Sequence, residues 1–395
     1  RLRRIRLAPI SASFERSASS CAQTVSQPRF CSADTRQRIA AIGRAQPLNE
    51  HCPGKTGLRY RSFEAAFQSA RREGLFRQIG QLYRADGRLG RDWVSLMKHL
   101  SEAGATNLNL GRLLEGHANA VQLVRLYGDA GHKAWLDRSL ESDLILGVWG
   151  ADDPDAARIE MVDARPILMG AKRYASGLGM VSQAVVPIAD EAGHLQLYLL
   201  PVDDPDRQDA SVWSVSGMQD SASGRFSFAD FPIEPGMRFG ATGDYKREPF
   251  FEGGIWRCAA VHLGGLEAIL SMTIEHLDQS GRLDHPLQSE RLGHGIMHAR
   301  TARFWVEDAA RRIEEPQSEE TTEFAVAAAS YTRLQVEASG LAVIEIARRA
   351  VGLSSFRTDH PLNAAISDLS VYLWQANPDA LLLHKARAML RGFAS

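Results

Sequence analysis

The sequence has few cysteines, no excess of charge of one sign and no long uninterrupted apolar run, and each absence narrows the class of protein. The four cysteines lack the spacing of metal ligands, so a reducing compartment such as the cytoplasm is expected. Apolar stretches such as 261–270 are interrupted by His262 and Glu267, so no membrane span is expected. With 46 basic and 47 acidic side chains, nothing in the charge favours nucleic acid or a membrane as a partner.

The chain of 395 residues is long for one compact domain, so two or three structural parts are expected. Residues 1–33 are rich in Arg and Ser, and Glu15 is their one acidic residue. This composition is typical of a targeting peptide, an upstream extension or a disordered tail alike. The fold is therefore inferred from the residues that follow.

The spacing of apolar residues changes twice along the rest of the chain. Residues 34–140 show helical spacing, residues 141–244 form short runs bounded by turn residues, and residues 245–395 return to helical spacing. The turn residues at 190–193 lie between two alternating runs and predict a hairpin. We therefore expect an α+β protein with an N-terminal helical domain, a central antiparallel β-barrel domain and a C-terminal four-helix bundle.

Three stretches of the middle region carry a family resemblance. They are LILGVWGADDPDAARIE, GAKRYASGLGMVSQAVV and VWSVSGMQDSASGRFSFADFPI. In this order, between two helical parts, they resemble the flavin-facing stretches and the third β signature of the acyl-CoA dehydrogenase superfamily. The resemblance covers about 34–392 and implies an enzyme that holds FAD.

The resemblance assigns five residues of the middle region to flavin binding: Trp149, Gly150, Ala151, Tyr174 and Ser176. Tyr174 stands where the family has an aromatic residue beside the flavin, and Ser176 where it has a hydroxyl group that points at N5. Ala151 stands in place of a threonine, so only a backbone N–H remains there. Without the resemblance, Trp149 and Tyr174 would be interpreted as core residues and Ser176 as part of a turn.

Two C-terminal segments resemble the family's binding site for the FAD pyrophosphate, which lies between subunits. In GRLDHPLQSERL, Arg282 and Gln288 match the family, whereas His285 and Pro286 replace its Phe-Gly pair. An arginine at a helix start can pair with two phosphates. Gly352 stands where the family has a glycine turn beside the phosphates. A solvated linker arginine and a helix C-cap explain Arg282 and Gly352 equally well.

The segment 366–379, ISDLSVYLWQANPD, begins as a helix and is broken by Asn377 and Pro378. In the resembling dehydrogenases a carboxylate near this break removes the α-proton of an acyl-CoA while a hydride leaves to the flavin. Aligning Ser367 and Asp368 with the family's Arg-Asp pair places Ala376 at the usual glutamate. The usual base is therefore missing from this sequence.

Two other carboxylates are candidates for the base. Glu252 precedes the first helix of the C-terminal part, near the position that a minority of the family uses, and Asp379 follows the break. Glu252 could equally be a helix-capping residue.

A sister branch of the superfamily uses the same scaffold to oxygenate aromatic or sulfur compounds with a C-terminal histidine. His360, Pro361 and Leu362 resemble an opening motif of that branch, and His384 is then the candidate catalytic histidine. A third possibility is a protein that has lost catalysis and acts by flavin binding or by association alone.

Two clusters could suggest a metal site. His294 and His298 lie one helical turn apart, and Asp152, Asp153 and Asp155 form an acidic turn. Neither cluster has a full ligand set at suitable spacing, so no metal is predicted.

The function expected from the resemblance is α,β-dehydrogenation of an acyl-CoA thioester with FAD, as in fatty acid metabolism. The same resemblance implies a homodimer or homotetramer and an electron-transferring flavoprotein as a possible partner. Flavin-dependent monooxygenation and non-catalytic binding remain the alternatives.

Overall fold

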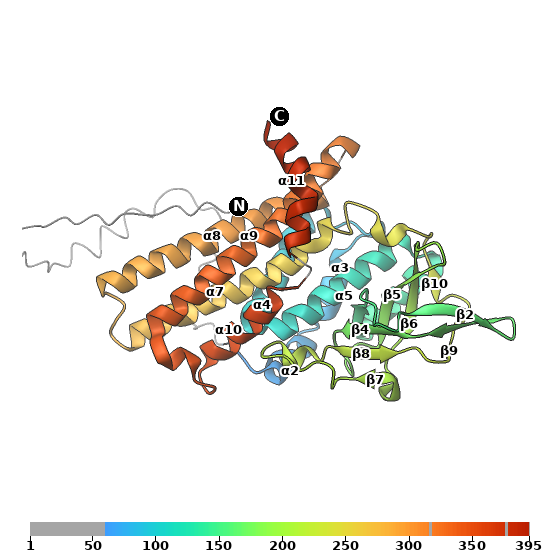
Figure 1. Cartoon of the computed structure of the whole chain (residues 1–395), viewed down its shortest axis with the longest axis horizontal. Coiled ribbons are helices and arrows are strands. Elements are labelled where there is room, and N and C mark those ends of the chain that lie inside the picture. Colours follow the sequence, from blue (N-terminus) through green and yellow to red (C-terminus); the bar gives the residue numbers. More distant parts are fainter. Residues whose placement is uncertain (1–59, 316–317, 376–377, 395) are drawn as a thin grey trace, which may run out of the picture. The chain divides into compact units, whose positions relative to one another are not determined.

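The computed structural model describes residues 60–315, 318–375 and 378–394 (Figure 1). The predicted extension at 1–33 and the cysteines Cys21, Cys31 and Cys52 lie outside the described residues. The described chain begins with helices α2 (Phe63–Arg72), α3 (Leu75–Leu82), α4 (Trp93–Thr106), α5 (Leu108–Tyr127) and α6 (Ala130–Glu141), with a short 3-10 turn η1 (Gly90–Asp92) before α4. Most of residues 60–140 are thus helical, as predicted, and residues 34–59 of the predicted helical domain lie outside the described residues.

Helix α5 lies at the centre of the described structure and packs closely with α4 and the later helix α7. Asn107 caps α5, since its side chain accepts hydrogen bonds from the second and third N–H groups of the helix.

Helices α4 and α7 approach each other closely at two glycines. A Cβ atom at Gly104 of α4 would lie 2.2 Å from the carbonyl oxygen of Val261. A Cβ atom at Gly264 of α7 would lie 1.8 Å from the carbonyl oxygen of Ser101. The two glycines therefore allow backbone contact between α4 and α7.

Within the described residues, ten short strands form three separate sheets. The largest has the order β1-β5-β6-β10, and the others have the orders β2-β3-β9 and β4-β8-β7. The strands are β1 (Leu146–Val148), β2 (Arg158–Val162), β3 (Arg165–Met169), β4 (Ala171–Ala175), β5 (Gln183–Ala189), β6 (Leu195–Pro201), β7 (Gln208–Asp209), β8 (Gly224–Ser227), β9 (Phe231–Pro232) and β10 (Arg238–Phe239). The predicted hairpin at 190–193 is confirmed, because it joins the antiparallel strands β5 and β6.

The predicted antiparallel β-barrel is wrong. A barrel needs a continuous hydrogen-bonded circuit of strands, whereas this region is divided into three sheets and contains the parallel pair β1–β5. All five residues of β2 are exposed, so the β2–β3 hairpin does not turn a face into a barrel interior. The register between β4 and β8 also shifts between Arg173 and Ala175, where Tyr174 has φ 54°.

The C-terminal part is helical, but the predicted fourth long helix is two shorter helices. Helices α7 (Trp256–Gln279), α8 (Pro286–Glu314) and α9 (Glu319–Val351) are long and lie side by side (Figure 1). They are followed by α10 (Pro361–Tyr372) and α11 (Pro378–Ala394), with 3-10 turns η5 (Gly253–Ile255) before α7 and η6 (Gly352–Phe356) after α9. Arg333 of α9 donates hydrogen bonds to the carbonyl oxygens of Leu373 and Gln375, and these bonds satisfy the end of α10.

The segment Gly253–Gln279, which contains α7, is long and apolar enough to pass a membrane-span test by length and composition. Within the described chain, however, 78% of its most apolar window is buried by the rest of the protein. The central helix of a packed helical core has the same properties. This segment is therefore explained as a core helix of the fold.

Candidate functional site

A cavity of about 850 Å³ lies where four parts of the fold meet. One wall is formed by α5 and the start of α7, the opposite wall by loops and strand ends of the β region, and the remaining sides by the segment 250–255 and the end of α10. Cavities of this size bind small molecules and cofactors. This cavity is therefore the candidate functional site.

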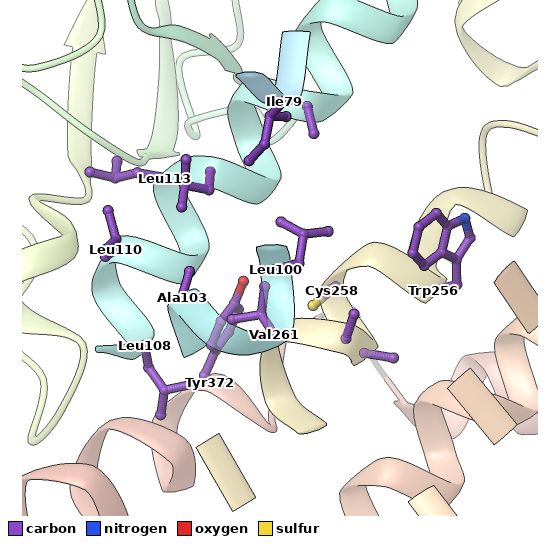
Figure 2. Packing of buried hydrophobic residues seen from close by; sticks show 14 of the residues in the cluster. Ile79, Leu100, Ala103, Leu108, Leu110, Leu113, Trp256, Cys258, Val261 and Tyr372 are labelled. Carbon is purple, nitrogen blue, oxygen red and sulfur yellow. The ribbon is translucent and has the colours of Figure 1, made fainter. Parts of the chain in front are cut away.

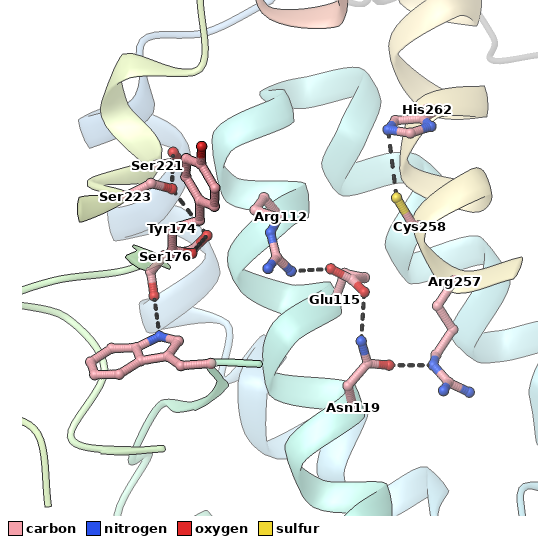
Figure 3. A network of polar contacts seen from close by, with 11 residues as sticks. Arg112, Glu115, Asn119, Tyr174, Ser176, Ser221, Ser223, Arg257, Cys258 and His262 are labelled. Atoms are coloured by element: carbon pink, nitrogen blue, oxygen red, sulfur yellow. Dashed lines mark hydrogen bonds and ion pairs between the residues drawn. The ribbon is translucent and has the colours of Figure 1, made fainter. Parts of the chain in front are cut away.

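The β wall carries three buried serine hydroxyls in a row (Figure 3). Ser176 Oγ lies 3.0 Å from Ser223 Oγ, which lies 2.9 Å from Ser221 Oγ, and Ser221 donates to the carbonyl oxygen of Met218 at 2.7 Å. If each hydroxyl donates to the next oxygen along this row, Ser176 keeps its acceptor lone pairs free. The row thus places a polar group with hydrogen-bonding capacity at the cavity wall.

Backbone strain is concentrated around this row of hydroxyls. Tyr174, Met218 and Ala222 have φ values of 54°, 56° and 43°, in the left-handed region that residues with a side chain rarely adopt. Tyr174 is 51% exposed, and its ring makes an edge contact with Trp213 at 6.1 Å between centroids. Strained residues of this kind occur at ligand sites more often than elsewhere.

The helical wall carries a chain of charged and amide groups (Figure 3). The carboxylate of Glu115 pairs with the guanidinium of Arg112 and accepts a hydrogen bond from Asn119 Nδ2 at 2.5 Å. Asn119 Oδ1 accepts from Arg257 Nε at 2.5 Å, and Arg257 Nη1 lies 3.3 Å from Glu314 Oε1. The spacing of Arg112, Glu115 and Asn119 along α5 places them on one helical face. Their charges are neutralised in pairs.

Glu252, the first candidate base, lies in the cavity wall and forms an ion pair with Lys385 of α11. Its side chain is 32% exposed. The alternative role for Glu252 was helix capping, but Glu248 performs it. The Glu248 carboxylate accepts hydrogen bonds from the backbone N–H groups of Glu252 and Gly253, at 3.0 and 3.3 Å. Glu252 is thus a carboxylate of the cavity whose charge already has a partner.

Cys258 also borders the cavity, in contact with two other buried side chains. Its Sγ lies 3.6 Å from His262 Nε2 (Figure 3). The ring of His262 makes an edge contact with Tyr372 at 4.3 Å between centroids. Burial raises the pKa of the Cys258 thiol to about 11 and holds the pKa of His262 well below its ordinary value. Since both groups stay neutral near pH 7, the pair is not a thiolate nucleophile.

Four of the five predicted flavin-binding residues line the cavity: Gly150, Ala151, Tyr174 and Ser176. A Cβ atom at Gly150 would lie 2.8 Å from the hydroxyl oxygen of Tyr245, so glycine permits this close approach. The fifth, Trp149, is 1% exposed and donates from Nε1 to the carbonyl oxygen of Ser176 at 3.1 Å. Trp149 therefore supports the cavity wall from the core.

The predicted pyrophosphate residues lie together at the junctions α7–α8 and α9–η6, and none of them lines the cavity. Arg282 Nη1 and Gln288 Nε2 both lie near the carbonyl oxygen of Ala350, at 3.5 and 3.4 Å. Gly352 ends α9 with φ 80°, and its N–H donates to the carbonyl oxygen of Arg348. The C-cap interpretation of Gly352 is thus visible in the structure.

The remaining candidates near the C-terminus do not contribute described side chains to the cavity. Asp379 is an exposed residue in the first turn of α11, and the side chain of His384 lies outside the described residues. Ala376 and Asn377 also lie outside them. His360 caps α10, because its Nδ1 accepts from the N–H of Leu362 at 3.2 Å.

The acidic turn has cationic partners in the protein. Asp152 pairs with Lys172 at 2.6 Å, Asp153 with Arg225 at 3.4 Å and Asp155 with Arg158 at 2.7 Å. No group of three or more His, Cys, Asp or Glu side chains within the described ranges is arranged to hold a metal ion, His294 and His298 included.

The fold of this chain is the acyl-CoA dehydrogenase fold. No protein-family model matches the sequence, and no curated protein matches it. Solved structures do match, with low sequence identity. The complex of TdsC from Paenibacillus sp. A11-2 with FMN and indole has a TM-score of 0.70 at 16% identity, over 84% of this chain and 91% of that chain.

Two further structures show that the fold does not distinguish between reactions. Methanesulfinate monooxygenase MsuC from Pseudomonas fluorescens has a TM-score of 0.69 at 17% identity, over 83% of this chain and 92% of that chain. Butyryl-CoA dehydrogenase from Megasphaera elsdenii has a TM-score of 0.68 at 16% identity, over 83% and 94%. Oxygenases and dehydrogenases are matched equally well, so the reaction must be inferred from the cavity.

Sequence reasoning missed the helical wall of the cavity, which is formed by Arg112, Glu115, Asn119 and Arg257. One signal was present: these polar residues interrupt otherwise apolar helical segments at helical spacing. A buried polar face on a core helix requires partners elsewhere in the fold. The identity of those partners depends on how α5 and α7 pack, which the sequence does not specify.

Proposed function

We propose that this chain is a flavin-dependent monooxygenase. The observation that supports this choice is the state of the two carboxylates that line the cavity among the described residues. Glu115 is paired with Arg112, and Glu252 with Lys385. Removal of an α-proton from a thioester needs an available carboxylate, whereas oxygen transfer from a reduced flavin does not.

The residues of the cavity fit the ring system of a flavin. An isoalloxazine ring needs an apolar surface on one face and hydrogen-bonding groups along its polar edge. Tyr174 and Trp213 offer the aromatic surface, and the row that ends at Ser176 offers the polar group. When bound in its reduced form, a flavin would supply the activation of O₂ for transfer of one oxygen atom to the substrate.

The protein's own contribution is to position the reactants and to exclude water. Ser223 fixes the orientation of Ser176 and Ser221, because it contacts both hydroxyls. Tyr372 lines the cavity at the end of α10 and is buried against α5 and α7 (Figure 2). Exclusion of water by these side chains would protect reactive oxygen chemistry from side reactions.

The test is oxygen transfer itself. Purified protein is mixed with reduced FMN or reduced FAD and ¹⁸O₂, with indole as the first probe substrate, and the products are analysed by mass spectrometry. We expect one labelled oxygen atom in the product and one in water. Oxygen consumption that yields only hydrogen peroxide across a broad panel of aromatic and sulfur compounds would contradict the proposal.

A second candidate, acyl-CoA dehydrogenation, is favoured by one observation: Glu252 borders the cavity and would become a free carboxylate if Lys385 moved away. Anaerobic addition of butyryl-CoA to FAD-loaded protein would then bleach the flavin, and Glu252→Gln would abolish bleaching without loss of flavin. Bleaching that persists in the variant would exclude Glu252 as the base.

The type of flavin and the assembly are part of the same proposal. We propose FAD if a second subunit brings Arg282, Gln288 and Gly352 to the phosphates, as the resemblance implies, and FMN if the chain acts alone. Chromatography of the flavin released from the protein identifies it as FAD or FMN. Light scattering measures the number of subunits in the assembly. FAD bound tightly by a monomer would contradict the shared site, and failure to bind any flavin would leave a non-catalytic protein. An electron-transferring flavoprotein is a proposed partner only for the dehydrogenase.

A further inference from the structure

We infer that Asp368 of α10 is a positioning residue for the β wall of the cavity. Asp368 does not line the cavity itself, and it acts through the backbone of Met218, which holds two side chains that do. The inference rests on the proposed function, since this wall is the one to which the flavin is assigned. Two features carry it: the hydrogen bonds that meet at the Asp368 carboxylate and the path from Met218 to the wall.

The Asp368 carboxylate joins three segments that are far apart in the sequence. Its Oδ2 accepts hydrogen bonds from the hydroxyl of Tyr60 at 2.6 Å and from Asn109 Nδ2 at 3.0 Å. Its Oδ1 accepts from the N–H of Met218 at 2.5 Å. Tyr60 precedes α2, Asn109 lies in α5, and Met218 lies in the loop between β7 and β8. One side chain of α10 therefore fixes this loop relative to the helical part of the fold.

The setting of Asp368 makes its hydrogen bonds directional. All three donors are neutral groups, and Asp220, the charged neighbour that acts on Asp368, is another carboxylate. Burial raises the pKa of Asp368, and the charge of Asp220 raises this pKa further. Because a carboxylate in this setting depends on its hydrogen-bond donors, the positions of those donors are closely defined.

The backbone of Met218 transmits this constraint to the cavity. Met218 has φ 56°, a left-handed conformation that persists only where the surrounding structure holds it. Its N–H is held by Asp368, and its carbonyl oxygen accepts from Ser221 Oγ at 2.7 Å and from Trp213 Nε1 at 2.8 Å. Ser221 and Trp213 both line the cavity. The orientation of two wall residues thus depends on a carboxylate outside the cavity.

The effect extends along the row of serine hydroxyls (Figure 3). Ser221 Oγ lies 2.9 Å from Ser223 Oγ, which lies 3.0 Å from Ser176 Oγ. A turn of the Met218 carbonyl would therefore release the first member of the row, and Trp213 would lose the acceptor for its indole N–H. Both changes would alter groups that face a bound ligand.

The experiment compares variants that remove different hydrogen bonds of the same carboxylate. Asp368→Ala removes the acceptor of the Met218 N–H, whereas Tyr60→Phe removes one donor and leaves the Met218 bond in place. FMN and FAD are titrated into the full-length protein, and hydrogen–deuterium exchange of residues 213–223 is measured without flavin. We expect Asp368→Ala to weaken flavin binding about tenfold and to speed exchange in 213–223. Tyr60→Phe should lower stability without changing flavin affinity or this exchange.

Two results would overturn the inference. One is a folded Asp368→Ala protein whose flavin affinity, or whose exchange in 213–223, equals that of the wild type. The other is a loss of flavin affinity in Tyr60→Phe as large as that in Asp368→Ala. The cause would then be the anchoring of the segment before α2, and the orientation of Met218 would not be responsible.

An exchange of side chains with Asn109 tests the same point if Asp368→Ala does not fold. Asp368→Asn places an amide N–H group against a donor in either orientation, because Oδ1 and Oδ2 both accept hydrogen bonds. Adding Asn109→Asp supplies an acceptor for that amide. We expect Asp368→Asn to weaken flavin binding and the double variant to recover the affinity to within about threefold of the wild type. A double variant that binds flavin no better than Asp368→Asn would contradict the role of these hydrogen bonds.

The outcomes separate this inference from the proposed function. Faster exchange at 213–223 in Asp368→Ala, in a protein whose wild type transfers no oxygen, would contradict the monooxygenase and support the positioning role. Oxygen transfer by the wild type, together with unaltered flavin affinity in Asp368→Ala, would do the reverse.

Discussion

The two walls of the cavity are built on different physical principles. The β wall has neutral hydroxyls on a strained backbone, with Tyr174 and Met218 in the left-handed region. The helical wall has regular backbone and ionised side chains whose charges cancel, from Arg112 on α5 to Glu314 on α8. The difference suggests separate roles. The β wall can orient a ligand through directional hydrogen bonds, whereas the helical wall sets the electrostatic environment.

The largest expected effect comes from breaking the buried ion pair at the far end of the helical wall. Arg257→Ala would leave the carboxylate of Glu314 buried without a counterion and should lower the free energy of unfolding by about 3–5 kcal/mol. Chemical denaturation measures this change. In the control, Glu267→Gln breaks a pair whose side chains are 28–30% exposed, and it should cost no more than about 1 kcal/mol. Similar losses in both variants would show that burial does not distinguish the two pairs.

The second prediction concerns His117, which is buried on α5. Its Nε2 donates to the carbonyl oxygen of Phe76 at 3.0 Å, and its Nδ1 accepts from the N–H of Leu146 at 3.1 Å. Burial lowers the pKa of His117 from its ordinary value to about 4. Between about pH 6.5 and 4 the unfolded state therefore binds a proton that the folded state does not, so stability falls as the pH falls through this window.

The size of this pH effect is on the order of 3 kcal/mol. His117→Gln should flatten the dependence of the free energy of unfolding on pH by about that amount, because glutamine does not titrate. Denaturant titrations at pH 4.5 and 7 measure the difference. Val121→Ala, at a buried position of the same helix that carries no titratable group, is the control and should leave the pH slope of the free energy of unfolding unchanged. An unaltered slope in His117→Gln would mean that His117 is not the group responsible.

The third prediction concerns the contact between the β wall and α10. A Cβ atom at Gly217 would lie 2.1 Å from the carbonyl oxygen of Ser367, and the neighbouring Met218 N–H donates to Asp368 Oδ1 at 2.5 Å. Gly217→Ala should therefore push the loop off α10 and cost about 1–3 kcal/mol. Thermal unfolding and flavin affinity should both decrease.

A matched glycine provides the control for this contact. Gly293 lies in α8 with no atom within 4 Å of an added Cβ, so Gly293→Ala should be neutral or slightly stabilising. A loss of stability in Gly293→Ala equal to that in Gly217→Ala would show that the close contact with α10 is not the cause.

The smallest expected effect comes from the row of hydroxyls. Ser223→Ala removes the oxygen that bridges Ser176 and Ser221, so Ser176 loses its fixed orientation. The loss of about 1 kcal/mol of hydrogen bonding should weaken flavin binding about fivefold with little change in stability. Ser211→Ala, at an exposed site, is the control and should leave flavin affinity unchanged. Equal flavin affinity in Ser223→Ala and the wild type would contradict the proposal that the serine hydroxyls of the β wall help to bind the flavin.

The sequence predicted the two helical parts, the β region between them and the hairpin at 190–193, because local periodicity and turn residues determine these features. It did not predict how the strands assemble. The expected barrel fails because the exposed strand β2 and the irregularity at Tyr174 divide the region into separate sheets, and both depend on tertiary contacts.

The site was predictable on one wall only. Gly150, Ala151, Tyr174 and Ser176 were assigned from two short stretches of the middle region that carry the family resemblance, and they line the cavity. The helical wall is assembled from side chains more than a hundred residues apart, such as Asn119 and Arg257, which lie 2.5 Å from each other. No local pattern encodes such a pair. It is a property of the packing of α5 against α7.

The most direct measurement of the central claim is a titration of the purified protein, freed of any bound cofactor, with FMN and with FAD, followed by flavin fluorescence in wild type and Ser223→Ala. The account predicts saturable binding of at least one flavin to the wild type at a ratio of one per chain, and weaker binding to the variant. Binding of neither flavin would contradict the assignment of the cavity as a flavin site.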